Sequence, residues 1–377
     1  MRPETRVDPA PPGHEGFLYG GVFLVSMAIL LLQIALTRIF SFTLWYHFAY
    51  VTISVALLGY GASGALLAVF PALAGPAPAR RLSAYAFACG VAIVVALLAF
   101  SEIPFHPFQM MSMLLRDQVL EVPHVQFLYL IVFYLAAIAP FFFAGLCMSV
   151  ALTTLSEHVS RLYFFDLVGA GVGCLIVCFA ISTLSTPGAV ITAAVIVSLA
   201  SVMFSMAAGR RGWLTHSIGT IFIGVLGLTV LSVADFAPSP EKFLAAFLDQ
   251  GEAITMYSHQ WSPIFRTDAF GFTDEDNSRG GGYAGWGSSP HWKANAATLG
   301  PKLRMITHDG DAGAVVYNFD GDLSKLEMFD HVILKTPYLL LNEPNVLVIG
   351  VGGGTDIVNA IKNHAVTSPA SSSTRSP

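Results

Sequence analysis

Charged residues are scarce in this chain: they make up 11% of its 377 residues, whereas soluble domains carry about 25%. Hydrophobic residues make up 54%, and the mean hydropathy is +0.65. So little charge does not suit the surface of a soluble domain, and we expect the chain to bury its apolar surface in a lipid bilayer. The net charge of −5 argues against a nucleic-acid partner, because such proteins carry basic patches.

Cysteine is scarce as well. The chain has four, all inside apolar stretches: Cys89, Cys147, Cys174 and Cys178. This placement favours neither a disulfide framework nor a zinc site, and we expect all four to be small packing residues. Cys174 and Cys178 share a helix face, but two thiols without further ligands make a poor metal site.

The sequence contains many long runs without a charged residue. They cover residues 17–37, 39–79, 82–101, 122–156, 167–209 and 212–234. A helix needs about 20 apolar residues to cross a bilayer, and the 43-residue run 167–209 is broken at Ser185–Gly188, so it predicts two spans. We therefore expect an α-helical multi-pass membrane domain of about seven spans over residues 1–235, with no cleavable signal peptide. An eighth crossing is an alternative only in the run 122–156, which has Pro140 at its middle. The expected location is the cell membrane, the inner membrane in a bacterium.

Hydropathy falls at the proline-rich segment Asp235–Pro240, which we take as the boundary between two regions. Residues 236–344 are expected to form a linker and a small β-rich segment, with a hairpin turn at Asp309–Gly313 and a flexible glycine-rich loop at 278–287. Apolar residues at helical spacing over Glu327–Leu341 predict a helix, which Pro337 interrupts. Residues 345–365 predict the first strand, loop and helix of an α/β Rossmann-like domain. Residues 366–377 predict a disordered, low-complexity tail.

The strongest functional signal is the segment Val346–Asp356. A short apolar run leads into four glycines and then into a helical pattern; the glycines are Gly350, Gly352, Gly353 and Gly354. A buried parallel strand is followed by such a loop in nucleotide-binding folds, because glycines let the backbone approach a ligand and the helix N-terminus offers free N–H groups. Asp356 is expected either to touch a cofactor or to serve only as the N-cap of the helix.

A second glycine pattern, Gly59–Gly64, also fits G-x-G-x-x-G. It lies inside an apolar run, with no strand before it and no acidic residue after it. There, and at Gly169 and Gly173, we expect small residues to let membrane helices approach closely.

Few ionisable groups lie in or beside the spans. Arg38 and His47 flank an aromatic stretch, and Asp166 begins the fifth span. A charge inside the membrane is unfavourable, so such groups pair, reach the interface or serve a transport pathway. We predict an Arg38–Asp166 pair at one membrane face, with a transport or proton-relay role as the alternative.

Two Asp-Gly-Asp motifs, at Asp309–Asp311 and Asp320–Asp322, have the residue types of a calcium loop. Counted from Asp309, the sixth position is Ala314 and the twelfth is Asp320. An EF-hand needs glycine and glutamate there, so we expect no metal.

From about Gln260 to Asn363 the chain resembles the spermidine synthase (aminopropyltransferase) family, which joins a small β domain to a methyltransferase-type Rossmann domain. The matching segments are the opening strand at Trp261–Asp268, the Asp-Gly hairpin at Asp309–Gly310, the helix before the core sheet at Phe329–Pro337 and the glycine-rich first motif at Val346–Asp356. The membrane half, at Leu36–Ser41, Trp45–Tyr50 and Tyr163–Gly173, resembles that of multi-pass bacterial proteins that carry such a domain.

The resemblance implies a transferase that uses S-adenosylmethionine or decarboxylated S-adenosylmethionine and passes a methyl or aminopropyl group to a small amine. It implies cofactor contacts at Asp309, at the four loop glycines and at Asp356, and leaves the catalytic residue unassigned. The chain departs from the family pattern at Gly353 in the first motif and at Gly313 after the hairpin. It also departs in the helix before the core sheet, which is the family's acceptor helix because it holds the amine acceptor; the positions there are Phe329, Asp330, His331 and Lys335. The family's ribose-binding and catalytic acidic residues would follow Pro377, so we expect an inactive or incomplete transferase. The alternative is a membrane transporter or scaffold with a vestigial nucleotide-binding domain.

The arginines predict an orientation in the membrane. With seven spans, the loops on the N-terminal side carry Arg2, Arg6, Arg80, Arg81, Arg161, Arg210 and Arg211, and the opposite loops carry Arg38 and Arg116. The positive-inside rule then places the N-terminus in the cytoplasm and the C-terminal region outside. Adenosyl cofactors are cytosolic, so a working enzyme needs the reverse, and an eighth crossing would remove the bias. We predict a cytoplasmic C-terminal region.

Overall fold

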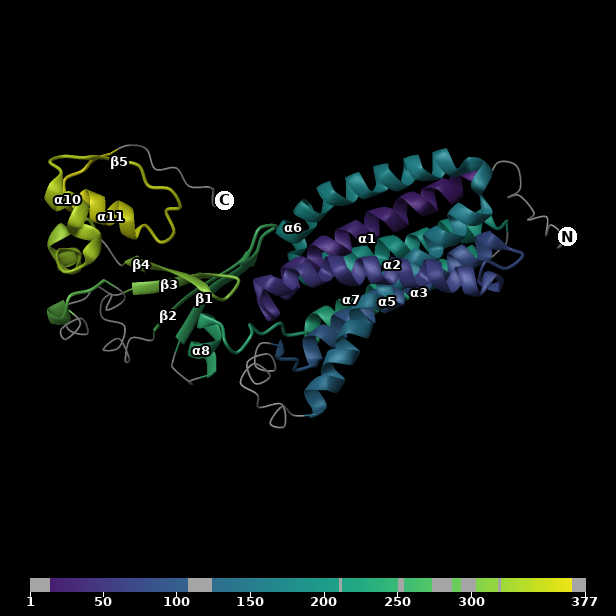
Figure 1. The fold of residues 1–377 in the computed structure, drawn as a ribbon, viewed down its shortest axis with the longest axis horizontal. Coiled ribbons are helices and arrows are strands. Elements are labelled where there is room, and N and C mark those ends of the chain that lie inside the picture. Colours follow the sequence, from purple (N-terminus) through teal and green to yellow (C-terminus); the bar gives the residue numbers. More distant parts are fainter. Residues whose placement is uncertain are drawn as a thin grey trace. The chain divides into compact units, whose positions relative to one another are not determined.

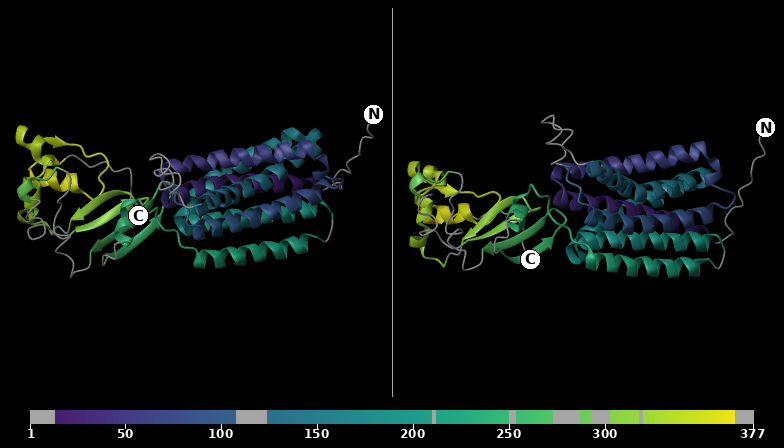
Figure 2. Two further views of the ribbon diagram at one scale, coloured as in Figure 1. Left: turned by 60° about the horizontal axis from the view of Figure 1, so that its bottom comes forward. Right: turned by 90° about the horizontal axis from the view of Figure 1, so that it is seen from below.

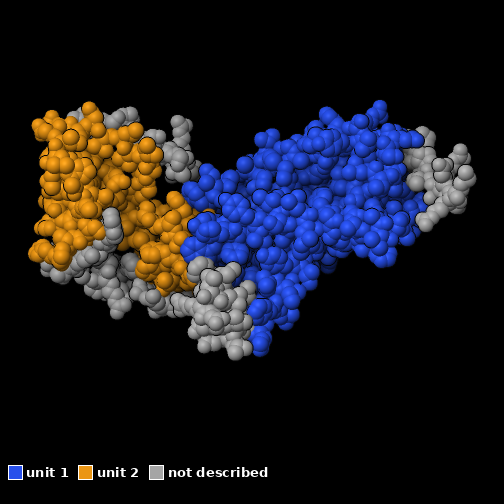
Figure 3. Space-filling model, in the orientation of Figure 1, with its two compact units in different colours: residues 1–239, 261–265 blue, residues 240–260, 266–377 orange. Residues whose placement is uncertain are grey.

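The computed structural model describes residues 14–107, 124–209, 212–249, 254–272, 287–292, 303–317 and 320–367. The chain forms two compact units (Figure 3): unit 1 is residues 1–239 with 261–265, and unit 2 is residues 240–260 with 266–377. The division after Ser239 lies within the proline-rich segment Asp235–Pro240. Most of the glycine-rich loop expected at 278–287 lies outside the described residues.

Unit 1 is a bundle of long helices that run side by side (Figures 1 and 2). They are α1 (Glu15–Thr43), α2 (Val51–Val69), α3 (Pro78–Glu102), α5 (His124–Thr154), α6 (Val159–Ala207) and α7 (Trp213–Val233), with short 3-10 helices at Tyr46–Tyr50, Pro71–Leu73 and Ser156–His158. In the described ranges, six helices are long and apolar enough to cross a membrane. The bundle agrees with a multi-pass membrane protein.

Apolar side chains cover the outside of the bundle as well as its inside. Leu57, Leu175 and Phe179 are each more than 70% exposed. A helix on the surface of a soluble protein keeps one polar face, whereas a helix that is apolar all round suits a membrane. The outer side chains therefore fit contact with lipid.

The longest helix, α6, consists of two antiparallel halves. Ser185 has a φ of 70° and Pro187 follows it, so the backbone leaves the helical conformation there. Gly169 packs against the backbone of Phe23, and the ring of Phe204 packs against Gly21, on the same stretch of α1. Gly169 and Phe204 would stand about 50 Å apart in a straight helix, so α6 turns back on itself. The turn falls in the segment Ser185–Gly188 where the sequence predicts a break.

By contrast, α5 is one continuous helix from His124 to Thr154 and contains Pro140. It fills almost the whole apolar run 122–156. The alternative of an eighth crossing within this run is therefore wrong.

Small residues bring the helices of unit 1 together. A Cβ atom on Gly59 of α2 would lie 2.7 Å from the Cβ of Phe141 on α5, and one on Gly145 would lie 2.9 Å from the Cα of Tyr60. Gly169 and Gly173 of α6 meet the backbone of α1 at Phe23 and Met27 in the same way. The prediction that small residues serve helix packing is confirmed for Gly59, Gly169 and Gly173, whereas no described atom lies within 4 Å of a Cβ placed on Gly61.

The cysteines divide into two pairs. All four are free; Cys89 and Cys147 are buried in the bundle, whereas Cys174 and Cys178 lie exposed on α6. The expectation that all four pack inside the protein is wrong for the second pair.

Unit 2 begins with α8 (Phe243–Asp249) and an antiparallel sheet of four strands in the order β1-β2-β3-β4. The strands are β1 (Ile254–Trp261), β2 (Arg266–Phe272), β3 (Leu303–His308) and β4 (Ala312–Tyr317). The predicted hairpin joins β3 to β4, and Asp309 and Gly310 have φ values of 50° and 75° in its turn. The opening strand expected at Trp261–Asp268 is wrong. Ser262 accepts hydrogen bonds from the backbone N–H groups of Ile264 and Phe265, and this turn separates β1 from β2.

Short elements follow the sheet. They are the 3-10 helices η6 (Leu323–Asp330) and η7 (Ile333–Lys335), α10 (Thr336–Leu340), β5 (Asn345–Val346), α11 (Thr355–Lys362) and β6 (Val366–Thr367). The helix expected over Glu327–Leu341, interrupted at Pro337, is instead a series of three short helices, and Pro337 stands in the first turn of α10. Residues 366 and 367, expected in a disordered tail, form β6; the rest of the tail lies outside the described residues.

A small apolar core holds unit 2 together. Its buried members are Trp292, Tyr317, Leu326, Met328, Phe329 and Val332. Val358 of α11 and Val315 of β4 pack against it, so the core joins the helix to the sheet.

Candidate functional site

The glycine-rich loop joins two short parallel strands through a helix. β5 pairs with β6 in parallel, Asn345 beside Val366, and α11 connects them. Gly350, Gly352 and Gly354 have φ values of 76°, 53° and 87°, a left-handed conformation that glycine adopts without steric cost. The order of strand, glycine loop and helix agrees with the prediction, and the second strand completes a β–α–β unit.

Gly353 packs directly against the backbone of β4, a contact that the glycine motif does not predict. A Cβ atom there would overlap the carbonyl oxygen of Val315 and lie 2.5 Å from its carbonyl carbon. Thr355 also donates a hydrogen bond to the Val315 carbonyl, at 3.4 Å. The loop therefore docks on the backbone of β4, and at Gly353 the missing side chain makes room for the protein itself.

The other side of the loop is open. In the described part of the chain, no atom lies within 4 Å of a Cβ placed on Gly350 or Gly354. Gly354 is the N-cap of α11 and provides no side-chain cap, so the first N–H groups of the helix are left to another partner. A helix N-terminus of this kind suits a negatively charged or polar group.

Asp356 lies exposed in the first turn of α11. The alternative that it serves as the helix N-cap is wrong, because Gly354 occupies that position. Partial burial, together with the nearby Asp356 carboxylate, raises the pKa of Tyr338 on α10. The Tyr338 hydroxyl, protonated at neutral pH like any phenol, is a possible hydrogen-bond donor near Asp356. Sequence reasoning used Tyr338 only as an apolar helix position, and no motif marks it.

Asp309, the remaining predicted contact, lies in the β3–β4 turn. Its carboxylate accepts a hydrogen bond from the backbone N–H of Arg266 at 2.8 Å, and its carbonyl accepts one from Lys242 at 2.6 Å. The glycine loop meets β4 at Ala314 and Val315, about 10–15 Å further along at the rise of a strand. The structure therefore brings Gly350, Gly352, Gly353, Gly354 and Asp356 together and leaves Asp309 in the hairpin.

Buried charges hold this hairpin. Lys242 is 2% exposed, and burial lowers its pKa to about 8, against the attraction of Asp309, Asp311 and Asp268. Asp268 on β2 is fully buried; burial raises its pKa, while the guanidinium of Arg266, 2.9 Å away, opposes the rise. Neither Lys242 nor Asp268 stands in a motif, so sequence reasoning missed both.

The residues that depart from the family's acceptor helix have structural contacts. Phe329 is buried against Tyr317, and the ring of His331 stacks on Trp292 with centroids 5.6 Å apart. Asp330 forms ion pairs with Lys335 at 2.6 Å and Lys362 at 2.8 Å. Partial burial alone would raise the pKa of Asp330, but the hydrogen bonds from these two lysines outweigh it and lower the pKa.

The strand before the loop is shorter and more exposed than the sequence predicts. The expected buried strand runs to Ile349, but β5 ends at Val346, and Leu347 and Ile349 are 63% and 82% exposed. Leu339 and Leu340 of α10 are also exposed. Parallel sheets bury such residues on both faces, so this unit presents an apolar surface without a cover in the described chain.

The acidic motif at Asp320–Asp322 caps η6. Asp322 accepts a hydrogen bond from the backbone N–H of Ser324 at 3.0 Å, and Asp320 forms an ion pair with Lys325. Among the described residues, no three metal-ligating side chains come together.

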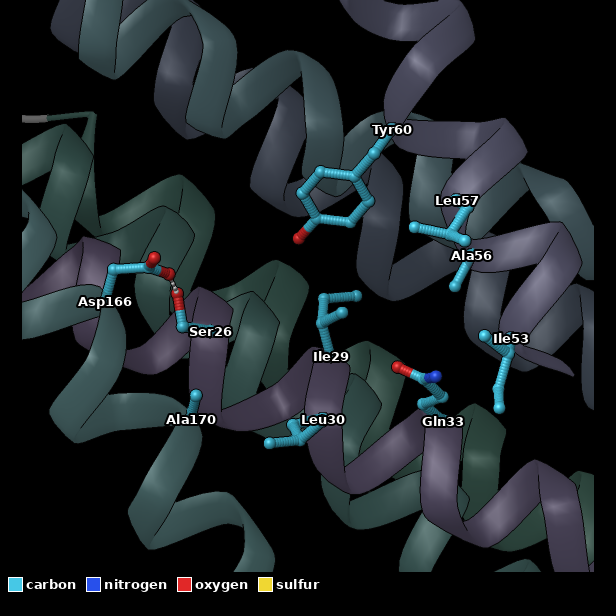
Figure 4. Close-up of a pocket in the computed structure, with 10 residues that line it drawn as sticks. All are labelled: Ser26, Ile29, Leu30, Gln33, Ile53, Ala56, Leu57, Tyr60, Asp166 and Ala170. Carbon is cyan, nitrogen blue, oxygen red and sulfur yellow. Dashed lines mark hydrogen bonds between the residues drawn. The ribbon is translucent and has the colours of Figure 1, made fainter.

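The ionisable groups of unit 1 are not arranged as predicted. Asp166 accepts a hydrogen bond from the hydroxyl of Ser26, whereas Arg38 donates to the carbonyl of Ile264. Ser26 and Arg38 are both on α1, about 18 Å apart along the helix axis. The predicted Arg38–Asp166 pair is therefore wrong. Asp166 instead lines a cavity of about 260 Å³ between α1, α2 and α6 (Figure 4).

Comparisons of the chain with models of protein families, with curated proteins and with solved structures give no match. The resemblance to the spermidine synthase family thus rests on the residues quoted above.

Proposed function

We propose that the chain is a membrane-bound protein of the spermidine synthase-like class. In this proposal unit 2 holds the adenosyl end of an S-adenosylmethionine-type cofactor, from which a methyl or aminopropyl group is transferred to a small amine. The observation that carries this proposal is the β–α–β unit of β5, α11 and β6. Its loop has left-handed glycines and an uncapped helix N-terminus, the features that accept a nucleotide-like ligand.

The residues on the open side of the loop fit such a cofactor. The backbone N–H groups beside Gly350 and Gly354 can donate to its polar groups, since no atom of the described residues lies within 4 Å of a Cβ placed on either glycine. The Asp356 carboxylate can accept from the cofactor's amino group, with the Tyr338 hydroxyl as a neighbouring donor. When bound, the cofactor supplies an electrophilic carbon beside a sulfonium; the described residues hold and orient its adenosyl part.

We also propose seven membrane crossings. Six helices are long and apolar enough to cross, and α6 contributes two crossings because it turns back at Ser185. With an odd number of crossings, the chain leaves unit 1 on the side of the membrane opposite its N-terminus. Adenosyl cofactors are cytosolic, so the proposal requires unit 2 in the cytoplasm, against the bias of the loop arginines.

A ligand footprint tests the cofactor proposal. The full chain in lipid nanodiscs is subjected to hydrogen–deuterium exchange with and without millimolar S-adenosylmethionine. We expect slower exchange of the amides at 350–358, and no such protection with methionine alone. Gly350→Ala should remove the protection.

Gly321→Ala is the matched control, since Gly321 also has a left-handed φ, of 99°, and no atom within 4 Å of an added Cβ. It should leave the footprint unchanged. No protection at 350–358, or protection that Gly350→Ala leaves intact, would contradict the proposal.

The cavity beside Asp166 favours a second function, a membrane transporter. Transport activity that survives deletion of the chain beyond Asp235 would support it, whereas adenosyl binding at the glycine loop supports the first proposal.

A further inference from the structure

An acidic cavity lies between helices of unit 1 and opens at the outer surface of the bundle, where its lining residues Ile53 and Leu57 are 49% and 71% exposed (Figure 4). It has a volume of about 260 Å³, and its walls come from α1, α2 and α6. Four of its lining residues are polar, namely Ser26, Gln33, Tyr60 and Asp166; the others are alanine, leucine and isoleucine. The cavity therefore has one charged group, the Asp166 carboxylate, and an otherwise largely aliphatic lining.

Asp166 has no cationic partner among the described residues. Its carboxylate accepts a hydrogen bond from Ser26, and no ion pair in the described chain includes it. Arg161 stands five residues earlier on α6, which places it about 140° around the helix and away from the cavity. A carboxylate without a cation inside the apolar thickness of a membrane is unfavourable, so a cationic ligand would gain binding energy here.

The carboxylate is partly buried and lies beyond the first turns of α6. Asp166 lies about 10 Å along α6 from the start of that helix at Val159. The charged head of a lipid stays at the membrane interface, above this depth. The ligand is therefore a small molecule rather than the headgroup of a lipid.

The shape of the cavity decides between a metal ion and an organic cation. A single carboxylate with a hydroxyl and an amide is a poor ligand set for a metal, and a cavity of this volume is much larger than a bare ion. In Figure 4 the Tyr60 hydroxyl points toward the space beside Asp166, while Ile29 and Leu57 continue the wall. This arrangement fits an ammonium head against Asp166, Ser26 and Tyr60, with an alkyl chain along the aliphatic side.

We infer that the cavity is a binding site for a small alkylammonium ion, with Asp166 as its counter-ion. The inference rests on neither the adenosyl site nor the number of crossings. It assigns to unit 1 a ligand chemistry of its own.

Equilibrium binding of radiolabelled hexylammonium to the full chain, in nanodiscs of phosphatidylcholine only, tests the site. This lipid has no primary amine that could compete. We expect saturable binding with one site per chain, and binding of the neutral analogue hexanol at least tenfold weaker. Asp166→Asn should weaken hexylammonium binding at least tenfold, whereas Asp166→Glu, which keeps the charge, should retain most of it.

Glu157→Gln is the matched control, because Glu157 is an exposed carboxylate just before α6 and does not line the cavity. It should bind hexylammonium as the unsubstituted chain does. Thermal unfolding of each variant separates lost binding from lost folding, and Asp166→Glu carries the test if Asp166→Asn unfolds. Equal binding of hexanol and hexylammonium, or binding that Asp166→Asn leaves unchanged in a folded variant, would overturn the inference.

Discussion

Replacement of Gly353 by alanine should detach the glycine loop from the sheet. The added methyl carbon would lie 2.5 Å from the carbonyl carbon of Val315, whereas two carbon atoms in contact need about 3.5 Å. Loop and strand would have to separate by roughly 1 Å. β4 cannot easily yield, because Val315 is paired with Met305 of β3 and packs against the core of unit 2.

Overpacking of this kind costs about 1–3 kcal/mol. Gly353 does not have a positive φ, so the whole effect comes from the contact with β4. At Gly350 the situation is reversed: its φ is 76° and the space around it is open, so alanine there should cost about 1 kcal/mol through backbone strain alone.

Hydrogen–deuterium exchange of α11 measures the difference. We expect the amides of 358–362 to lose protection in Gly353→Ala, because the helix is held to β4 through this loop and through Val358. In Gly350→Ala the same amides should stay close to their original protection. If Gly353→Ala exchanges like the unsubstituted chain, the loop does not dock on β4 and the reason given for this glycine is wrong.

Three further predictions concern unit 2. Calorimetry of the purified chain with S-adenosylmethionine should show binding weaker than micromolar, because ligand sites bury about 70–90% of a ligand and the described unit offers only one loop and one helix; a micromolar Kd would contradict this. The pKa of Lys242 falls from 10.5 to about 8 on folding, so between these pH values the unfolded chain binds more protons than the folded chain. The free energy of unfolding of unit 2 should therefore rise with pH in this range, by up to about 3 kcal/mol, and should be flat below pH 8. Urea unfolding at pH 8 and pH 10.5 measures the rise, which Lys242→Met should abolish. Asp330→Asn should destabilise α11 by about 0.5–1 kcal/mol through the lost ion pairs with Lys335 and Lys362; unchanged exchange of α11 in this variant would show that the pairs contribute nothing.

The sequence predicts the helices of unit 1 because their signal is local. A run of apolar residues of membrane length has few other structures available, and the break at Ser185–Gly188 is marked by its own residues. The Asp309–Gly310 hairpin is predicted for the same reason: a turn with two left-handed residues needs aspartate or asparagine followed by glycine.

The errors arise where a residue's partner lies far away in the chain. Nothing near Asp166 in the sequence points to Ser26, 140 residues earlier, so the sequence predicts a pair with Arg38, a charged residue at the end of another span. Gly353 shows the same limit within the candidate site. The motif predicts a glycine for a ligand, but only the folded chain reveals that the backbone of Val315 occupies the space.

Local signals were also misjudged. Ser262 and Pro263 form a turn whose hydroxyl accepts two backbone hydrogen bonds, and this turn divides the strand expected at Trp261–Asp268. The sequence pattern predicts that Pro337 interrupts a helix, whereas proline in a first helical turn starts one, because its missing N–H would have no partner there.

The side of the membrane on which unit 2 lies is the most direct test of the proposed function. Alkaline phosphatase, which is active only outside the cytoplasm, and a fluorescent protein, which is fluorescent only inside it, are each fused after Asp235. We predict fluorescence and no phosphatase activity, because an adenosyl cofactor reaches unit 2 only from the cytosol. Phosphatase activity would contradict both the orientation and the transferase.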